Sequence, residues 1–297
     1  MTTTPTPERA KAPRKKRAEK GVRITERDIL LLQRACRYGA LTIPMLQHTV
    51  ARREVLDMFG NLTGETVALH RSTIHEQVHR LVRAGALETS DGPSNVIRPR
   101  NLPALLVPTR GGYDLAGTEL TYKRPALATL LHTLSVAQMG LRHEADDWEV
   151  VTDRQVRSDI QQWRSERERA RRAKEPVPQV PQDADWIATE TDNGSLRGGA
   201  LSGARGPRTH APDLIIKNAA GERNAVEVEL TAKTVADLRE VMKAFASTGK
   251  YRRVIYYCPT RSIAARVANA ANERGTELAE RVTVRKFTPL YGTGCFL

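Results

Sequence analysis

Residues 212–233 read PDLIIKNAAGERNAVEVELTAK and carry the strongest structural signal in this chain. Two short apolar runs, 213–216 and 225–230, are typical of strands in an interior sheet. Because side chains alternate along a strand, Glu227 and Glu229 share one face of the second run and the valines take the other. A buried carboxylate without a partner costs several kcal/mol, so these charges require compensation. We therefore expect a charged site at this point of the sheet.

The acidic groups of this segment are placed to act together. If Asp213 on the neighbouring strand points the same way as the two glutamates, the three form an all-oxygen cluster that suits Mg²⁺ or Mn²⁺ as cofactor. A metal there would activate water for attack on phosphorus, and the Lys233 ammonium would stabilise the developing negative charge. The predicted catalytic residues are Asp213, Glu227, Glu229 and Lys233, the first three also being metal ligands, with His132 and His210 as possible auxiliaries.

A purely structural explanation of the same residues stays open. Asp213 would close a turn after Pro212, the two glutamates would pair with arginines, and Lys233 would begin a helix. Buried ion pairs of this kind occur, although each charge then needs its own partner and removal of one leaves the other uncompensated. The pattern by itself therefore allows both a catalytic and a structural role.

The charge of the whole chain points to a polyanionic partner. The formal net charge is +13 at pH 7, and each phosphate neutralised by Lys or Arg releases condensed counterions. Residues 1–21 are basic and poor in apolar side chains, so we expect a disordered tail. Such a tail serves either as a DNA-binding arm or as a solubility segment. Double-stranded DNA is the predicted partner.

The N-terminal part of the chain predicts three short helices. Thr25 can cap the first, with Asp28 as its capping-box partner. The second starts near Thr42, where Pro44 fits the first turn. The third covers residues 71–84, with apolar residues at helical spacing and Gly85 as its terminator. A hairpin-like stretch ending at residues 105–112 follows.

This order of elements is typical of a winged helix-turn-helix over residues 22–125. The helix at 71–84 would then be the recognition helix, whose solvent face meets base edges or phosphates. The predicted DNA-binding residues are, on this helix, Arg71, Thr73, His75, Gln77 and Arg80, and, on the wing, Arg98, Arg100 and Arg110.

The remainder, residues 126–297, predicts a mixed sheet with helices on both faces. We expect a helix at 126–145 and a strand at 148–156, followed by a very basic helix at 157–175. Proline- and glycine-rich runs then indicate a mobile insertion, at about 157–209 in all, before the two acidic strands. Further expected elements are helices at 234–245 and 262–274 and strands at 252–257 and 281–287. The predicted fold class is α/β (α+β), with two domains that each have a core.

The compartment is predicted from what the sequence lacks. Cys36, Cys258 and Cys295 are scattered without the close pairing of zinc sites or disulfide frameworks. Neither a signal peptide nor a run of 18 apolar residues occurs. We expect a cytoplasmic, nucleoid-associated protein with no membrane contact. A homodimer is possible.

The acidic segment resembles the PD-(D/E)xK superfamily, whose fold is that of restriction endonucleases. In that pattern an Asp stands at one strand and (D/E)-x-K on the next. Asp213 matches the Asp and Glu227 the following acid, whereas Glu229 occupies the place of the lysine. Lys233, four residues farther on, would act as a displaced lysine.

The winged helix joined to THAPDLIIK and AVEVELTAKT resembles the replication-relaxation family of plasmids and other mobile elements, over roughly residues 22–290. The resemblance implies a role in replication, relaxation or mobilisation of DNA, with a relaxase or replication protein as a possible partner. Three functions remain open at this stage: a metal-dependent nickase or endonuclease, a non-catalytic DNA-binding regulator, and an adaptor that recruits another protein.

Overall fold

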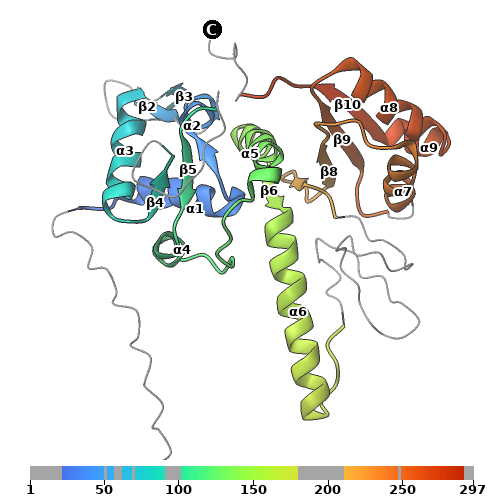
Figure 1. Cartoon of the computed structure of the whole chain (residues 1–297), viewed down its shortest axis with the longest axis horizontal. Helices are drawn as coiled ribbons and strands as arrows, with labels where there is room; N and C mark the ends of the chain where they lie inside the picture. The colour runs from blue at the N-terminus through green and yellow to red at the C-terminus, as the bar shows by residue number, and fades with distance from the viewer. Residues whose placement is uncertain are drawn as a thin grey trace, which may run out of the picture.

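A computed structural model describes residues 22–49, 52–56, 62–68, 71–90, 102–179, 211–246 and 249–290. These residues form a mixed α/β structure, as the fold class predicts. Figure 1 shows an N-terminal half and a C-terminal half on either side of α5 (Leu130–Ala145), while α6 (Asp153–Ala173) extends away from both. No helix within the described ranges is both long enough and apolar enough to cross a membrane.

The N-terminal half contains a small antiparallel sheet of order β1-β5-β4 and a separate antiparallel pair, β2 and β3. Its elements in chain order are α1 (Glu26–Tyr38), β1 (Leu41–Thr42), α2 (Ile43–Thr49), β2 (Arg52–Leu56), β3 (Leu62–Ala68), α3 (Arg71–Arg83), β4 (Leu87–Thr89), β5 (Leu105–Pro108) and α4 (Arg110–Ala116).

Local sequence signals explain the ends of these helices. Thr25 and Asp28 form the predicted capping box of α1, in which each side chain accepts the other residue's backbone N–H. Gly85, at φ +70°, follows α3 in a conformation that favours glycine. Thr109 caps α4, which begins at Arg110. The prediction that Arg110 belongs to a wing hairpin is therefore wrong, and neither α4 nor the β2–β3 pair was predicted.

The C-terminal half is built on the predicted mixed sheet, with strand order β10-β9-β8-β7-β6. Strands β8, β9 and β10 are parallel, and β7 is antiparallel to both β6 and β8. The elements are β6 (Glu149–Thr152), β7 (Leu214–Lys217), β8 (Arg223–Val228), α7 (Val235–Ala246), β9 (Arg253–Cys258), α8 (Arg261–Asn272), α9 (Thr276–Arg281) and β10 (Val282–Lys286).

Two buried clusters show which helices cover each face of this sheet. Leu214, Val226 and Ile255 lie in one cluster with residues of α5. Ile215 and Ala225 lie in the other cluster with residues of α7 and α8. Helices thus lie on both faces, as expected from the alternation of strands and helices.

The region around α6 differs from its prediction. Thr152 and Gln155 form a capping box, so helix geometry begins at Asp153 and the strand expected at 148–156 ends at Thr152. Residues 157–173 form most of α6, which confirms the basic helix expected at 157–175 and makes this part of the predicted 157–209 insertion a regular helix. Residues 180–209 of that insertion lie outside the described residues.

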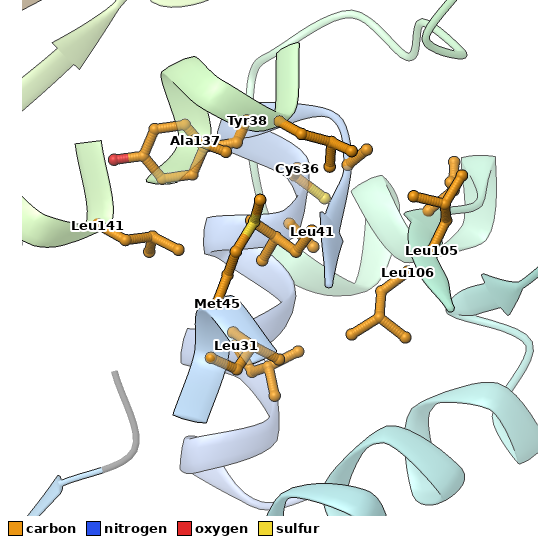
Figure 2. Close-up of a cluster of buried hydrophobic side chains, with 14 of the residues drawn as sticks. Leu31, Cys36, Tyr38, Leu41, Met45, Leu105, Leu106, Ala137 and Leu141 are labelled. Carbon is orange, nitrogen blue, oxygen red and sulfur yellow. The ribbon is translucent and has the colours of Figure 1, made fainter. Parts of the chain in front are cut away.

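The hydrophobic core runs through α5 from one half to the other. Tyr38 lies so close to α5 that a Cβ on Gly140 would meet its hydroxyl at 2.4 Å. The Glu144 carboxylate accepts hydrogen bonds from Tyr38 at 2.8 Å and from two arginines of α1. One cluster therefore spans the two halves that were predicted as domains with separate cores, whereas the second cluster lies in the C-terminal half alone. Figure 2 shows its central part, with Leu31, Cys36, Tyr38, Leu41, Met45, Leu105, Leu106, Ala137 and Leu141 labelled.

Candidate functional site

Strand pairing brings the predicted acidic residues together. Asp213 stands immediately before β7, and the antiparallel register with β8 places it beside the end of that strand. Its Oδ2 accepts a hydrogen bond from the Val228 backbone N–H at 2.8 Å. Glu227 and Glu229 are both buried, the first in β8 and the second just after it. The three carboxylates therefore lie around one end of β8.

Asp213 is held from a second side by α5. The His132 Nε2 lies 3.0 Å from Asp213 Oδ1. Burial raises the pKa of Asp213, but the His132 contact and the Val228 N–H outweigh it and leave the pKa below its usual range. The same hydrogen bond raises the pKa of His132. His132, predicted only as a possible auxiliary, thus reaches the cluster; His210 lies outside the described residues.

Lys233 turns back onto the cluster from the loop before α7. Its Nζ lies 2.6 Å from Glu229 Oε2, and the Glu229 side chain is only 6% exposed, against 35% for Lys233. Burial lowers the pKa of Lys233, yet the negative charges of Glu227 and Glu229 outweigh burial and raise it. The pKa of Glu229 is raised by burial, with Lys233 acting in the opposite direction. Lys233 is therefore the ion-pair partner of Glu229 and is also influenced by the charge of Glu227.

Tyr256 is a member of the cluster that the motifs did not indicate. It lies on β9 beside Glu227 in the parallel register, and its side chain is completely buried. Its hydroxyl has no hydrogen-bond partner in the described part of the chain. Burial, followed by the charges of Glu227 and Glu229, raises its pKa well above the usual range. Alternation in the sequence puts Val254, Tyr256 and Cys258 on one face of β9, but only the register with β8 shows that this is the glutamate face.

The donor atoms can be compared with what a divalent cation requires. Mg²⁺ and Mn²⁺ prefer several oxygen ligands converging on one point. In this arrangement both oxygens of Asp213 already accept hydrogen bonds, and Lys233 lies against Glu229. Within the described ranges no group of three or more His, Cys, Asp or Glu side chains is arranged to hold a metal ion. The cluster as it stands does not fit the predicted Mg²⁺ or Mn²⁺ centre.

The surface of α3 was the other predicted site. Two of the five residues predicted there to bind DNA, Gln77 and Arg80, make contacts within the protein instead. Gln77 is buried, so its placement on the solvent face is wrong. Arg80 donates to both oxygens of Asp28, at 2.9 Å and 3.1 Å, and thereby ties α3 to α1. Burial raises the pKa of Asp28, but the hydrogen bonds from Arg80 and Thr25 outweigh it and lower the pKa overall. The Arg80 charge is therefore already paired within the protein, where it stabilises the contact between α3 and α1.

The other three predicted residues of α3 are at least partly exposed to solvent. Arg71 is exposed and donates from Nε to His75 Nε2 at 3.2 Å, while Thr73 and His75 are half-buried. His79 and Arg83 are exposed farther along the helix. Arg83 was not predicted, although it follows His79 at helical spacing. Arg98 and Arg100 lie outside the described residues, and Arg110 is exposed at the start of α4.

Comparison of the chain with protein-family models, with curated proteins and with solved structures gave no match. Any functional assignment therefore depends on the residues and their geometry.

Proposed function

We propose that the protein binds double-stranded DNA through a winged helix-turn-helix in its N-terminal half. Support comes from the order α1, β1, α2, α3, β4, β5, in which the β2–β3 pair is inserted between α2 and α3, and from the antiparallel sheet in which β5 lies between β1 and β4. In a winged helix the last helix before the hairpin enters the major groove. That helix is α3 (Figure 1).

The observation that carries this proposal is the division of α3 into two sides. Ile74, Val78 and Leu81 are buried in the core. Arg71, His79 and Arg83 lie on the exposed side. Side chains of these types meet phosphates and base edges, and the net charge of +13 favours the same partner. Binding would then depend on Arg71 and Arg83 rather than on Arg80.

For the C-terminal half we propose a restriction-endonuclease-like domain that holds DNA or a protein partner without cutting. The mixed sheet, with Asp213 before β7 and Glu227 in β8, supports the resemblance. The contact between Lys233 and Glu229 favours the non-catalytic form. In this proposal the protein acts in replication, relaxation or mobilisation of a plasmid, phage or other mobile element, together with a relaxase or replication protein.

A metal-dependent nickase or endonuclease is the second candidate. One observation favours it: Asp213, before β7, interacts electrostatically with Glu229 and Lys233 of the segment between β8 and α7, and His132 of α5 contacts Asp213. Such a grouping is what a phosphodiester-cutting site requires. Its weakness is the donor arrangement described above, which does not fit a divalent cation.

DNA affinity tests the proposal. Fluorescence anisotropy with a labelled 30-base-pair duplex would compare the wild type, the double variant Arg71→Ala/Arg83→Ala and the control Arg261→Ala/Arg266→Ala, which removes two exposed charges from α8. We expect the α3 variant to bind about tenfold more weakly at moderate salt, because it loses two phosphate contacts. Equal weakening by both variants would show that binding follows net charge alone.

A plasmid assay separates the two candidates. Supercoiled plasmid would be incubated with the protein in Mg²⁺, in Mn²⁺ and in EDTA, with Glu227→Ala in parallel. The non-catalytic proposal predicts intact plasmid that is shifted on the gel to the same extent with and without metal. Nicked or linear product that requires metal and disappears in the variant would establish the nuclease.

A further inference from the structure

The acidic cluster at the end of β8 contains its own cation. Lys233 lies four residues beyond Glu229, in the loop that leads to α7, and this loop returns its ammonium to 2.6 Å from Glu229 Oε2. Glu227 is buried on the same face of the strand and also acts on the Lys233 charge. The ammonium is therefore in contact with one buried carboxylate, Glu229, and close enough to a second, Glu227, for the charges to interact.

We propose that Lys233 is a resident cation: its ammonium takes the position that a divalent ion would occupy, and the cluster binds such an ion only after that ammonium is removed. The proposal concerns the cluster alone and does not depend on DNA binding by the N-terminal half.

Distances place the two cations in competition for the same oxygen of Glu229. Mg²⁺ or Mn²⁺ bound to Glu229 would stand about 2.1 Å from a carboxylate oxygen. The Lys233 Nζ lies 2.6 Å from Glu229 Oε2 and fills that volume. A divalent ion beside the ammonium would also meet strong repulsion, because like charges at contact distance are poorly screened in a buried site. Metal binding therefore requires displacement of Lys233.

Tyr256 provides a second and independent observation. Its hydroxyl is completely buried beside Glu227, and within the described residues it has no hydrogen-bond partner. Buried polar groups are nearly always satisfied, so an unpaired hydroxyl marks a position where a polar ligand fits. This observation is independent of the ion pair, because Lys233 contacts Glu229 and the unpaired hydroxyl belongs to Tyr256 on a different strand, β9. A hydrated metal ion would satisfy this hydroxyl through one of its bound waters once the ammonium is gone.

Binding of Mn²⁺, measured by the loss of the free-ion electron paramagnetic resonance signal, tests the proposal. The proteins are the wild type, Lys233→Met, the double variant Lys233→Met/Glu229→Gln, and the control Lys243→Met, which removes an exposed lysine of α7. We expect Lys233→Met to bind one Mn²⁺ about tenfold or more tightly than the wild type. The double variant and the control should bind as the wild type does.

Two results would overturn the proposal. One is stoichiometric Mn²⁺ binding by the wild type that is lost in Glu229→Gln. The other is a folded Lys233→Met protein that gains no affinity. Circular dichroism and a thermal melt establish folding for each variant. If Lys233→Met does not fold, Lys233→Gln removes the same charge with a polar side chain of similar length, and the same expectation applies to it.

Tyr256→Phe distinguishes binding inside the cluster from binding elsewhere. Introduced into Lys233→Met, it removes only the buried hydroxyl, so we expect the gained Mn²⁺ affinity to fall severalfold. Retention of the full gain would place the ion away from Tyr256 and contradict the proposed position.

Discussion

Each half of the molecule buries a negative charge, but the two halves satisfy it differently. In the N-terminal half, Asp28 is completely buried, and its carboxylate accepts from the Thr25 backbone, the Thr25 hydroxyl and two Arg80 nitrogens. In the C-terminal half, Lys233 contacts Glu229 in a cluster that also contains Asp213 and Glu227, and the buried Tyr256 hydroxyl has no partner among the residues that the structure describes. The Asp28 carboxylate is thus fully hydrogen-bonded, and we call Asp28, Thr25 and Arg80 the saturated unit. The acidic cluster of the C-terminal half still contains a hydroxyl that could form a further hydrogen bond.

This difference shows that a basic residue predicted to act in function can instead neutralise a buried carboxylate. Arg80 lies on a helix proposed to bind DNA, yet its charge is already bound to Asp28. Lys233 was predicted to act in phosphodiester cutting, yet it compensates Glu229. Residue type and spacing indicate both possibilities in each case. The number of partners around each buried carboxylate decides whether the basic residue has a structural or a functional role.

The largest effect is expected from breaking the saturated unit. Arg80→Ala leaves the Asp28 carboxylate buried without its cation, which should lower the free energy of unfolding by about 3 kcal/mol. Urea unfolding followed by circular dichroism measures the loss. Arg83→Ala, an exposed arginine one turn away, should change stability by less than about 0.5 kcal/mol. Similar losses in the two variants would contradict a special role for the Asp28–Arg80 pair.

Helix α5, between the two regions, contains a buried group that is stable only when uncharged, namely His143. Burial lowers the pKa of His143 to about 4, below the usual 6.5. The unfolded state then binds more protons between these values, so this stability is present above pH 6.5 and is lost as the pH falls toward 4. We expect a loss of about 2 kcal/mol between pH 7.5 and pH 5.

Urea unfolding at these two pH values would compare the wild type with His143→Gln. The variant removes the titrating group and keeps an acceptor for the Tyr257 hydroxyl, which lies 3.2 Å from His143 Nε2. Its stability should therefore depend less on pH over this interval. An unchanged pH dependence would show that other groups cause the acid sensitivity.

A smaller effect is expected from breaking the ionic contact in the second region. Lys233→Met should cost about 1 kcal/mol of folding free energy, because the lysine is partly exposed and solvent screens its contribution. Glu229→Gln in the same protein removes the charge that was left unpaired and should recover most of this loss. A double-mutant cycle from urea unfolding gives the coupling energy. A coupling near zero would mean that the 2.6 Å contact does not stabilise the cluster.

The smallest expected effect concerns DNA affinity at a single arginine. Arg71→Ala should weaken binding to a duplex about threefold to fivefold and reduce the slope of log affinity against log salt by about one. Arg266→Ala on α8 is the matched control. Anisotropy titrations at four salt concentrations give both quantities. An unchanged slope would remove Arg71 from the phosphate contacts.

Features set by neighbouring residues were predictable from the sequence. The Thr25–Asp28 capping box needs residues only three apart, and the shared face of Glu227 and Glu229 follows from strand alternation. The five-stranded sheet has the mixed character expected from alternating strands and helices. The winged helix-turn-helix and the nuclease-like domain stay predictions that DNA-binding and plasmid experiments must test.

Features set by distant residues were not predictable. Arg80 meets a carboxylate 52 positions away, and no local pattern in α3 indicates that pairing. Tyr256 reaches the acidic cluster only because β9 lies parallel to β8, a register fixed by the whole sheet. Gln77 was expected on the solvent face because it is polar, but the close approach of neighbouring elements buries it.

The shared helix α5 has a consequence for how the chain can be divided. A fragment that ends at residue 125 would lack Ala137, Leu141 and Glu144, which cover α1 and bind its arginines. Such a fragment would expose an apolar face and tend to aggregate. For the same reason a ligand that stabilises one half should raise the melting temperature of both. The chain should behave as one cooperative unit, and cutting it between the halves would not yield two working modules.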